Sequence, residues 1–160
     1  MIEVEVVNRQ DYHDVDSGQL VEASRYVFQT HSVTSGRVSI AVLDNKTIQE
    51  LNREFLDHDY PTDVLSFVLE REQERLEGEI AVSAEMAVQQ AVHYDWPAAH
   101  ELVLYVIHGA LHLVGLDDKR PESLEQMRSA EQQVCQHLGI GDPPRDHPLQ
   151  NPSEGDGSTC

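Results

Sequence analysis

The chain has 160 residues, which suits one domain with a buried core and is too short for two ordinary domains. Its formal net charge of -18 excludes a generic basic nucleic-acid binder, because such proteins gain most of their affinity from Lys and Arg side chains that neutralise phosphates. Any nucleic-acid function must therefore depend on a local positive cleft, on a bound metal ion, or on a partner that presents the nucleic acid.

The first half of the chain shows strand and helix periods in alternation. Ile2, Val4 and Val6 alternate with polar residues, which predicts a strand. Apolar residues recur at helical spacing over 17–30, and a second alternating run over 38–42 predicts another strand. The next helix is expected to start at a capping box formed by Thr47 and Glu50. This order of elements is typical of a domain that mixes helices with a sheet.

The second half continues the same pattern up to about residue 140. Strands are expected at 64–69 and 79–83, joined by a solvated acidic hairpin connection, and helices at 84–94 and 98–114. Pro121 suits the first turn of a last helix, and Gly139 is placed to end it. We therefore expect one α/β or α+β domain over 1–140, followed by a disordered tail over 141–160 that is rich in Pro, Gly, Asp and Ser.

The cysteines and the apolar segments indicate in which cellular compartment the protein is expected. Cys135 and Cys160 do not form a disulfide framework, so a reducing cytoplasm is expected. The chain does not open with a basic segment followed by an apolar one, so we expect no signal peptide. The most apolar stretch, 102–116, is shorter than the roughly 20 residues that span a bilayer, and two histidines interrupt it. We interpret this stretch as a buried helix and expect no membrane association.

The segment HGALHLVGLDD, residues 108–118, carries a predicted metal site. His108 and His112 are four residues apart, so they lie about 40° apart on one face of a helix and can reach one ion. Gly115 permits a helix stop and a sharp turn, after which Asp118 can fold back toward the same ion. Three protein ligands that leave one coordination position open are typical of catalytic zinc.

Two histidines four residues apart also arise by chance, and most such pairs are not ligands. Here, however, the pair interrupts an almost wholly apolar helix, and each buried imidazole without a polar partner costs about 1–3 kcal/mol. One ion satisfies both rings. Gly109 is costly within a helix, which indicates a packing or access requirement. It also stands where HExxH metallopeptidases carry their general base, which disfavours a metallopeptidase.

The same segment resembles the HGxLHLxGYxH signature of the YbeY family of bacterial endoribonucleases. LNREFLDHDYPTDVLSF at 51–67 and GEIAVSAEMAVQQA at 78–91 resemble two further blocks of that family, in the same order along the chain. The resemblance implies a single α/β domain with a small mixed sheet of about four strands, packed helices and a central metal-binding helix. It also implies zinc, single-stranded RNA as substrate, and a role in ribosomal RNA maturation at the small-subunit 3′ end and in ribosome quality control.

The chain departs from the family pattern at two positions. Asp118 stands where the third ligand is usually His, and because a carboxylate is the harder ligand, manganese or another transition metal becomes possible beside zinc. Leu56 stands where many members carry an Arg. Arg53, one turn earlier, is a candidate replacement, and a solvated helix face is the alternative. Asp63 of the TDVLSF block either orients a ligand histidine or water, or simply turns the chain.

Together these observations predict a metal-dependent endoribonuclease with one Zn²⁺ per chain, and an RNA partner that the ribosome or an assembly factor presents. The alternatives are a metallopeptidase and a non-catalytic metal-binding ribosome-assembly factor, which the acidic charge favours. Glu101 lies two turns before His108 on the same helix face, so it is either a partner of that ligand or a surface carboxylate. Nothing in the sequence indicates an oligomeric state.

Overall fold

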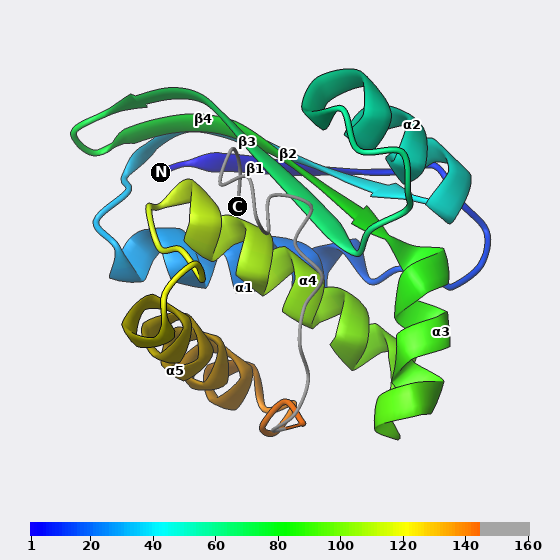
Figure 1. Cartoon of the computed structure of the whole chain (residues 1–160). Coiled ribbons are helices and arrows are strands. Elements are labelled where there is room, and N and C mark those ends of the chain that lie inside the picture. The colour runs from blue at the N-terminus through cyan, green and yellow to red at the C-terminus, as the bar shows by residue number, and fades with distance from the viewer. Residues whose placement is uncertain (145–160) are drawn as a thin grey trace.

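Residues 1–144 are described by a computed structural model with five helices and a four-stranded sheet, in which strands and helices alternate up to a hairpin of two strands and three helices follow it (Figure 1). The strands are β1 (Glu3–Asn8), β2 (Ser35–Leu43), β3 (Val64–Glu72) and β4 (Arg75–Ser83). The helices are α1 (Ser17–Thr30), α2 (Asn45–Leu56), α3 (Ala84–Tyr94), α4 (Ala98–Leu113) and α5 (Pro121–Leu138). The predicted α/β class is therefore confirmed, whereas the predicted tail lies outside the described residues except for 141–144.

The sheet is mixed and has the strand order β1-β2-β4-β3. β1, β2 and β4 run parallel, and β3 pairs with β4 in the antiparallel direction. The two strands of this hairpin are longer than predicted, because only Gln73 and Glu74 form the turn between them. The acidic segment was wrongly assigned to a connection. Its side chains are largely exposed, and a backbone ladder at the edge of a sheet forms without the apolar alternation that marks a half-buried strand.

Helices cover both faces of the sheet (Figure 1). α1 and α4 pack on one face with α5 outside them, and this side holds the main core, whereas α2 covers the opposite face over a smaller apolar cluster around Ile48 and Leu65. α4 contacts α1, α3, α5 and the sheet, so every side chain from Glu101 to Leu113 is buried. This position explains why the segment is apolar all round rather than amphipathic.

The start of α2 differs from the prediction. Asp44 is the N-cap residue, and its Oδ1 accepts a hydrogen bond of 2.8 Å from the backbone N–H of Thr47. Hydrogen bonds from the side chain and the backbone N–H of Thr47 lower the pKa of the Asp44 carboxyl. The expected capping box of Thr47 and Glu50 was therefore wrong, because an Asp three residues earlier satisfies the free N–H groups of the first turn. At the other end of the fold, Gly139 stops α5 with φ +74°, as expected.

No helix within residues 1–144 combines the length and the apolar character needed to cross a bilayer.

Gly109 lets α4 lie close against the sheet. A Cβ atom at this position would stand 2.9 Å from Cγ2 of Ile80 and 3.1 Å from Cγ2 of Val64, on β4 and β3. Both neighbours are buried and β-branched, so their side chains have little freedom to move away. The packing requirement inferred from the sequence is therefore real, and it sets the distance between α4 and the two strands.

We predict that Gly109→Ala destabilises the fold. Alanine would favour the helix by about 1 kcal/mol, but overpacking a dense core costs about 1–3 kcal/mol. The clash with Ile80 and Val64 is tight enough for overpacking to win, so the free energy of unfolding should fall by about 1 kcal/mol in urea titrations.

Gly18→Ala provides the matched control. Gly18 also lies within a helix, but its added Cβ would meet only Asp16 Oδ1, at an ordinary 3.4 Å. This variant should be neutral or slightly more stable. Equal effects of the two substitutions would show that helix propensity, and not contact with the sheet, governs position 109.

Candidate metal centre

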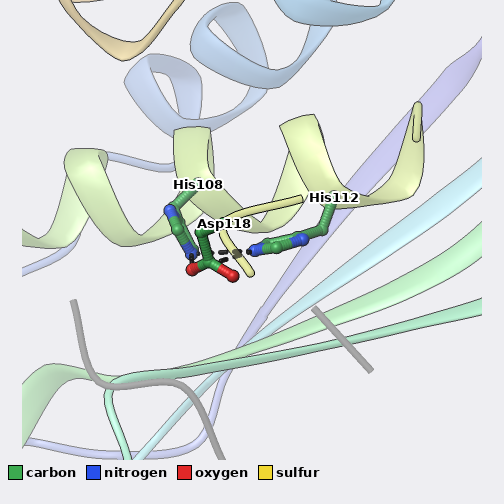
Figure 2. A group of neighbouring side chains, drawn as sticks. All are labelled: His108, His112 and Asp118. Carbon is green, nitrogen blue, oxygen red and sulfur yellow. Dashed lines mark hydrogen bonds and ion pairs between the residues drawn. The ribbon is translucent and has the colours of Figure 1, made fainter. Parts of the chain in front are cut away.

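His108, His112 and Asp118 converge on one point beside α4 (Figure 2). Each offers one ligand atom, and these atoms all lie within 4.8 Å of one another. The two histidines come from successive turns of α4, and Figure 2 shows their rings turned toward the carboxylate. Both rings are buried, with exposed fractions of 2% for His108 and 9% for His112. The structure thus brings together the three residues that the sequence predicts as metal ligands.

The turn after α4 returns Asp118 to the helix. Gly115 has φ +106°, and its N–H donates to the carbonyl of His112 while the N–H of Leu116 donates to that of Leu111. These two bonds form a Schellman motif, in which a left-handed residue, most often glycine, reverses the chain. Asp118 follows three residues later, within reach of both rings.

The distances within the group require a hydrogen or a cation between the two rings. Nε2 of His112 lies 2.9 Å from Nε2 of His108, and Asp118 Oδ2 lies 3.5 Å and 3.8 Å from these two atoms. Two unprotonated nitrogens would point their lone pairs at each other across this gap. The N–H of one neutral ring, or a cation shared by both rings, removes this repulsion, and the carboxylate would balance the charge of such a cation.

Burial and hydrogen bonding give His112 and Asp118 the protonation states of metal ligands. Burial lowers the pKa of His112 and outweighs the opposing hydrogen bond to Asp118, so the ring favours its neutral form. Burial alone would raise the pKa of Asp118, but hydrogen bonds to His108 and His112 outweigh it and hold the pKa below its usual range. Neutral imidazoles and an ionised carboxylate are the forms that coordinate metals. The donor set therefore fits a divalent transition metal such as zinc.

Glu131 is a buried member of this site that the sequence reasoning missed. Its Oε2 lies 2.6 Å from Nδ1 of His108, across the interface between α5 and α4. A signal for it was present in the sequence. Glu131 lies four residues after Met127 and four before Cys135, on the apolar stripe of α5, and a carboxylate on a buried stripe needs a partner.

Glu101 does not have the surface position that was one of its two interpretations. Its side chain is fully buried, and its Oε1 accepts a hydrogen bond of 2.7 Å from Nε1 of Trp96. Nδ1 of His108, which Glu101 was considered to approach, contacts Glu131 instead. The surface interpretation of Glu101 is therefore wrong.

Asp63 is buried at the start of β3. Its Oδ1 accepts hydrogen bonds from the backbone N–H of Val64 at 2.8 Å and from the Thr62 hydroxyl at 3.3 Å. The Asp63 carbonyl accepts from the N–H of Ser83 at 3.0 Å, which ties the beginning of β3 to the end of β4. These contacts match the turn-forming alternative, and a role in orienting a ligand or water stays a prediction.

Arg53 lies on α2, which covers the face of the sheet opposite α4 (Figure 1). Its side chain is 57% exposed and pairs with Asp59 Oδ1 at 3.6 Å. Leu56 packs against the small apolar cluster beneath α2. The structure thus places Arg53 apart from the three converging side chains, and its catalytic role stays a prediction.

Comparison with known proteins adds the family. The family model described as Endoribonuclease YbeY matches residues 5–139. The Endoribonuclease YbeY of Carboxydothermus hydrogenoformans is 38% identical over 139 residues, which cover 85% of this chain and 97% of that protein. The protein of the same name from Rhodopirellula baltica is 42% identical over 124 residues, which cover 76% of this chain but only 64% of that protein.

A solved structure agrees on the fold. The solution structure of TM1509 from Thermotoga maritima has a TM-score of 0.57 and 24% sequence identity, and the match covers 94% of this chain and 100% of that one. At this identity the match shows a shared fold alone. The family model, however, spans nearly all of the described residues, and the relatives share the sequence over most of its length. The chain therefore belongs to the YbeY endoribonuclease family.

Proposed function

We propose that this protein is a metal-dependent endoribonuclease that cleaves single-stranded RNA, matures ribosomal RNA at the small-subunit 3′ end and serves ribosome quality control. The observation that carries the proposal is the buried convergence of His108, His112 and Asp118 in a chain whose relatives are named endoribonucleases. A cation bound by the two imidazoles and the carboxylate would satisfy all three ligand atoms at once. A family of RNA-cleaving enzymes gives such a cation a chemical purpose.

One Zn²⁺ per chain is the proposed cofactor, with Mn²⁺ or another transition metal accepted because Asp118 supplies a hard oxygen ligand. When bound, such an ion would polarise a phosphoryl oxygen and lower the pKa of an attacking water. His108 and His112 hold the site from the rigid α4. The Asp118 side chain keeps 11% of its surface exposed, so the site meets solvent at the loop after α4. A phosphodiester would approach from that side.

The acidity of the chain shapes how RNA reaches this site. Lys119 and Arg120 directly follow Asp118 and are exposed. Their two charges balance those of Asp117 and Asp118, so a divalent ion would make this segment locally positive. The rest of the surface repels RNA at a net charge of -18. We therefore propose that the ribosome or an assembly factor presents the RNA, in the cytoplasm, to the metal-loaded site.

Asp63 and Arg53 are proposed to support the reaction without binding the metal ion. The hydrogen bonds of Asp63 at the start of β3 support a role in holding the strand beneath α4. Arg53 lies across the sheet from the metal group, so it would act by contacting RNA that extends around the edge of the domain. Its exposed ion pair with Asp59 is weak enough to be exchanged for a phosphate.

The two alternatives differ from this proposal in what they require of the site. A metallopeptidase of the HExxH type needs a carboxylate at the position of Gly109, where even a Cβ meets Ile80 and Val64. A non-catalytic assembly factor needs only a structural ion, and the negative charge of the chain favours it. The metallopeptidase thus differs from the proposed nuclease in its substrate, and the assembly factor differs in having no catalytic activity.

The ligand assignment predicts a sharp contrast between two neighbouring aspartates. Asp118→Asn removes an ionised ligand, so zinc affinity should fall by at least about tenfold, equivalent to 1.4 kcal/mol. Asp117→Asn is the matched control, because Asp117 Oδ1 accepts a hydrogen bond from the N–H of Lys119 within the same loop. Affinity is measured by competition with a chromophoric chelator.

The two histidine ligands are tested by elemental analysis of the purified protein. Purified protein should carry about one transition metal per chain, and the double variant His108→Ala/His112→Ala should carry none. Full metal retention in the double variant, or a larger loss from Asp117→Asn than from Asp118→Asn, contradicts the assigned ligands.

The proposed activity predicts metal-dependent cleavage of single-stranded RNA and no cleavage of casein. Zinc-loaded protein, His112→Ala protein and chelator-treated protein are compared on both substrates by gel electrophoresis. RNA cleavage only by the loaded wild type agrees with the proposal. Casein cleavage would identify a peptidase, and inactivity of pure loaded protein on both substrates would favour the assembly factor.

The proposed role of Arg53 predicts separate effects on metal and on RNA. Arg53→Ala should leave zinc content unchanged while lowering the rate of RNA cleavage several-fold at limiting substrate, because a phosphate contact is worth on the order of 1 kcal/mol. Arg37→Ala is the control, since Arg37 is also an exposed arginine in an ion pair, with Glu3 at 3.1 Å. Equal rates of RNA cleavage by the two variants would contradict a role of Arg53 in contacting RNA.

A further inference from the structure

Glu131 reaches the metal group from a helix that supplies none of its three ligands. α5 packs along α4, and at this interface Glu131 Oε2 lies 2.6 Å from Nδ1 of His108. Both side chains are buried, so water does not compete for the interaction. A distance this short is typical of a hydrogen bond to an ionised acceptor.

This contact decides which nitrogen of His108 carries the hydrogen. A neutral imidazole has one N–H and one lone pair, and a carboxylate oxygen can only accept. Opposite the Glu131 carboxylate, Nδ1 of a neutral His108 is the donor, which leaves the lone pair on Nε2. That atom faces Nε2 of His112 at 2.9 Å and Asp118 Oδ2 at 3.5 Å, where the three ligand atoms converge. With the opposite tautomer, His108 would present a hydrogen to this point and could not bind a metal.

We propose that Glu131 is a positioning residue, which sets the tautomer and the ring orientation of His108 and thereby prepares Nε2 as a ligand. The inference rests on the metal site of the proposed function. A histidine ligand whose second nitrogen donates to a carboxylate is oriented by it and becomes more basic, and loss of the carboxylate typically weakens metal binding 10–100-fold. Glu131 does not touch the substrate, because it lies behind the ring, on the side away from Asp118.

A purely structural role for Glu131 would tolerate different substitutions. In that case the residue would only help to attach α5 to α4, and any side chain of similar volume on the stripe shared with Met127 and Cys135 would replace it. Glu131→Met tests this, because methionine has a similar length, suits a buried stripe and cannot accept the hydrogen of Nδ1. Glu131→Gln keeps an acceptor oxygen and removes the charge. Glu125→Gln removes the same charge from an exposed position of α5 and is the control.

The first readout is the tautomer of His108 in metal-free protein, measured by long-range ¹H–¹⁵N correlation at a pH at which the imidazoles are neutral. Wild type, Glu131→Gln and Glu125→Gln should show Nδ1 protonated, and Glu131→Met should shift toward protonated Nε2. The second readout is zinc affinity by chelator competition. Glu131→Met should lose 10–100-fold, Glu131→Gln less than that, and Glu125→Gln nothing. Circular dichroism and thermal melting check that each variant folds.

Several results would overturn the inference. These are protonated Nε2 of His108 in the wild type, unchanged tautomer and zinc affinity in a folded Glu131→Met, or no zinc binding by the wild type. If Glu131→Met does not fold, the wild-type tautomer and Glu131→Gln still decide. Failure of the proposed nuclease is distinguishable, because it would appear as zinc-loaded wild type that leaves RNA intact while Glu131→Met still weakens zinc binding.

Discussion

The contact of Gly109 with Ile80 and Val64 brings the backbone of α4 onto the sheet, and the burial of the metal group follows from it. A larger residue would hold the helix away from β3 and β4, and water would enter beside His108 and His112. Burial in turn lowers the pKa of His112 and keeps it neutral. One missing side chain therefore supports both the packing of the central helix and the chemistry of its histidines.

Polar groups in an apolar helix create a cost that the surrounding elements offset. His108 receives Glu131 from α5 on one nitrogen and faces His112 and Asp118 with the other. Glu101, two turns earlier on α4, accepts a hydrogen bond from Nε1 of Trp96. Each partner comes from a different part of the chain, so the polar groups connect α4 to its neighbours as well as preparing the site. A buried polar network of this kind favours one arrangement of the helices over others.

The charge of the molecule limits the ways in which it can meet RNA. At -18, long-range forces oppose association with another polyanion, and only a local positive region can reverse them. The exposed pair Lys119 and Arg120 stands beside Asp118, where a bound cation would add to it. Attraction for RNA would then be confined to the site itself.

Features that depend on local geometry could be predicted from the amino-acid sequence. The spacing of His108 and His112, the turn at Gly115 and the bounds of α1 and α3 follow from helical periodicity and backbone freedom, and the structure agrees with them. The full length of the β3–β4 hairpin was not predicted, because its exposed ends carry no apolar alternation. The folded molecule was needed to show that Glu131 contacts His108, that Glu101 is buried and that Arg53 lies on a helix across the sheet. Those relations depend on how elements far apart in the chain pack together, and no local period records that.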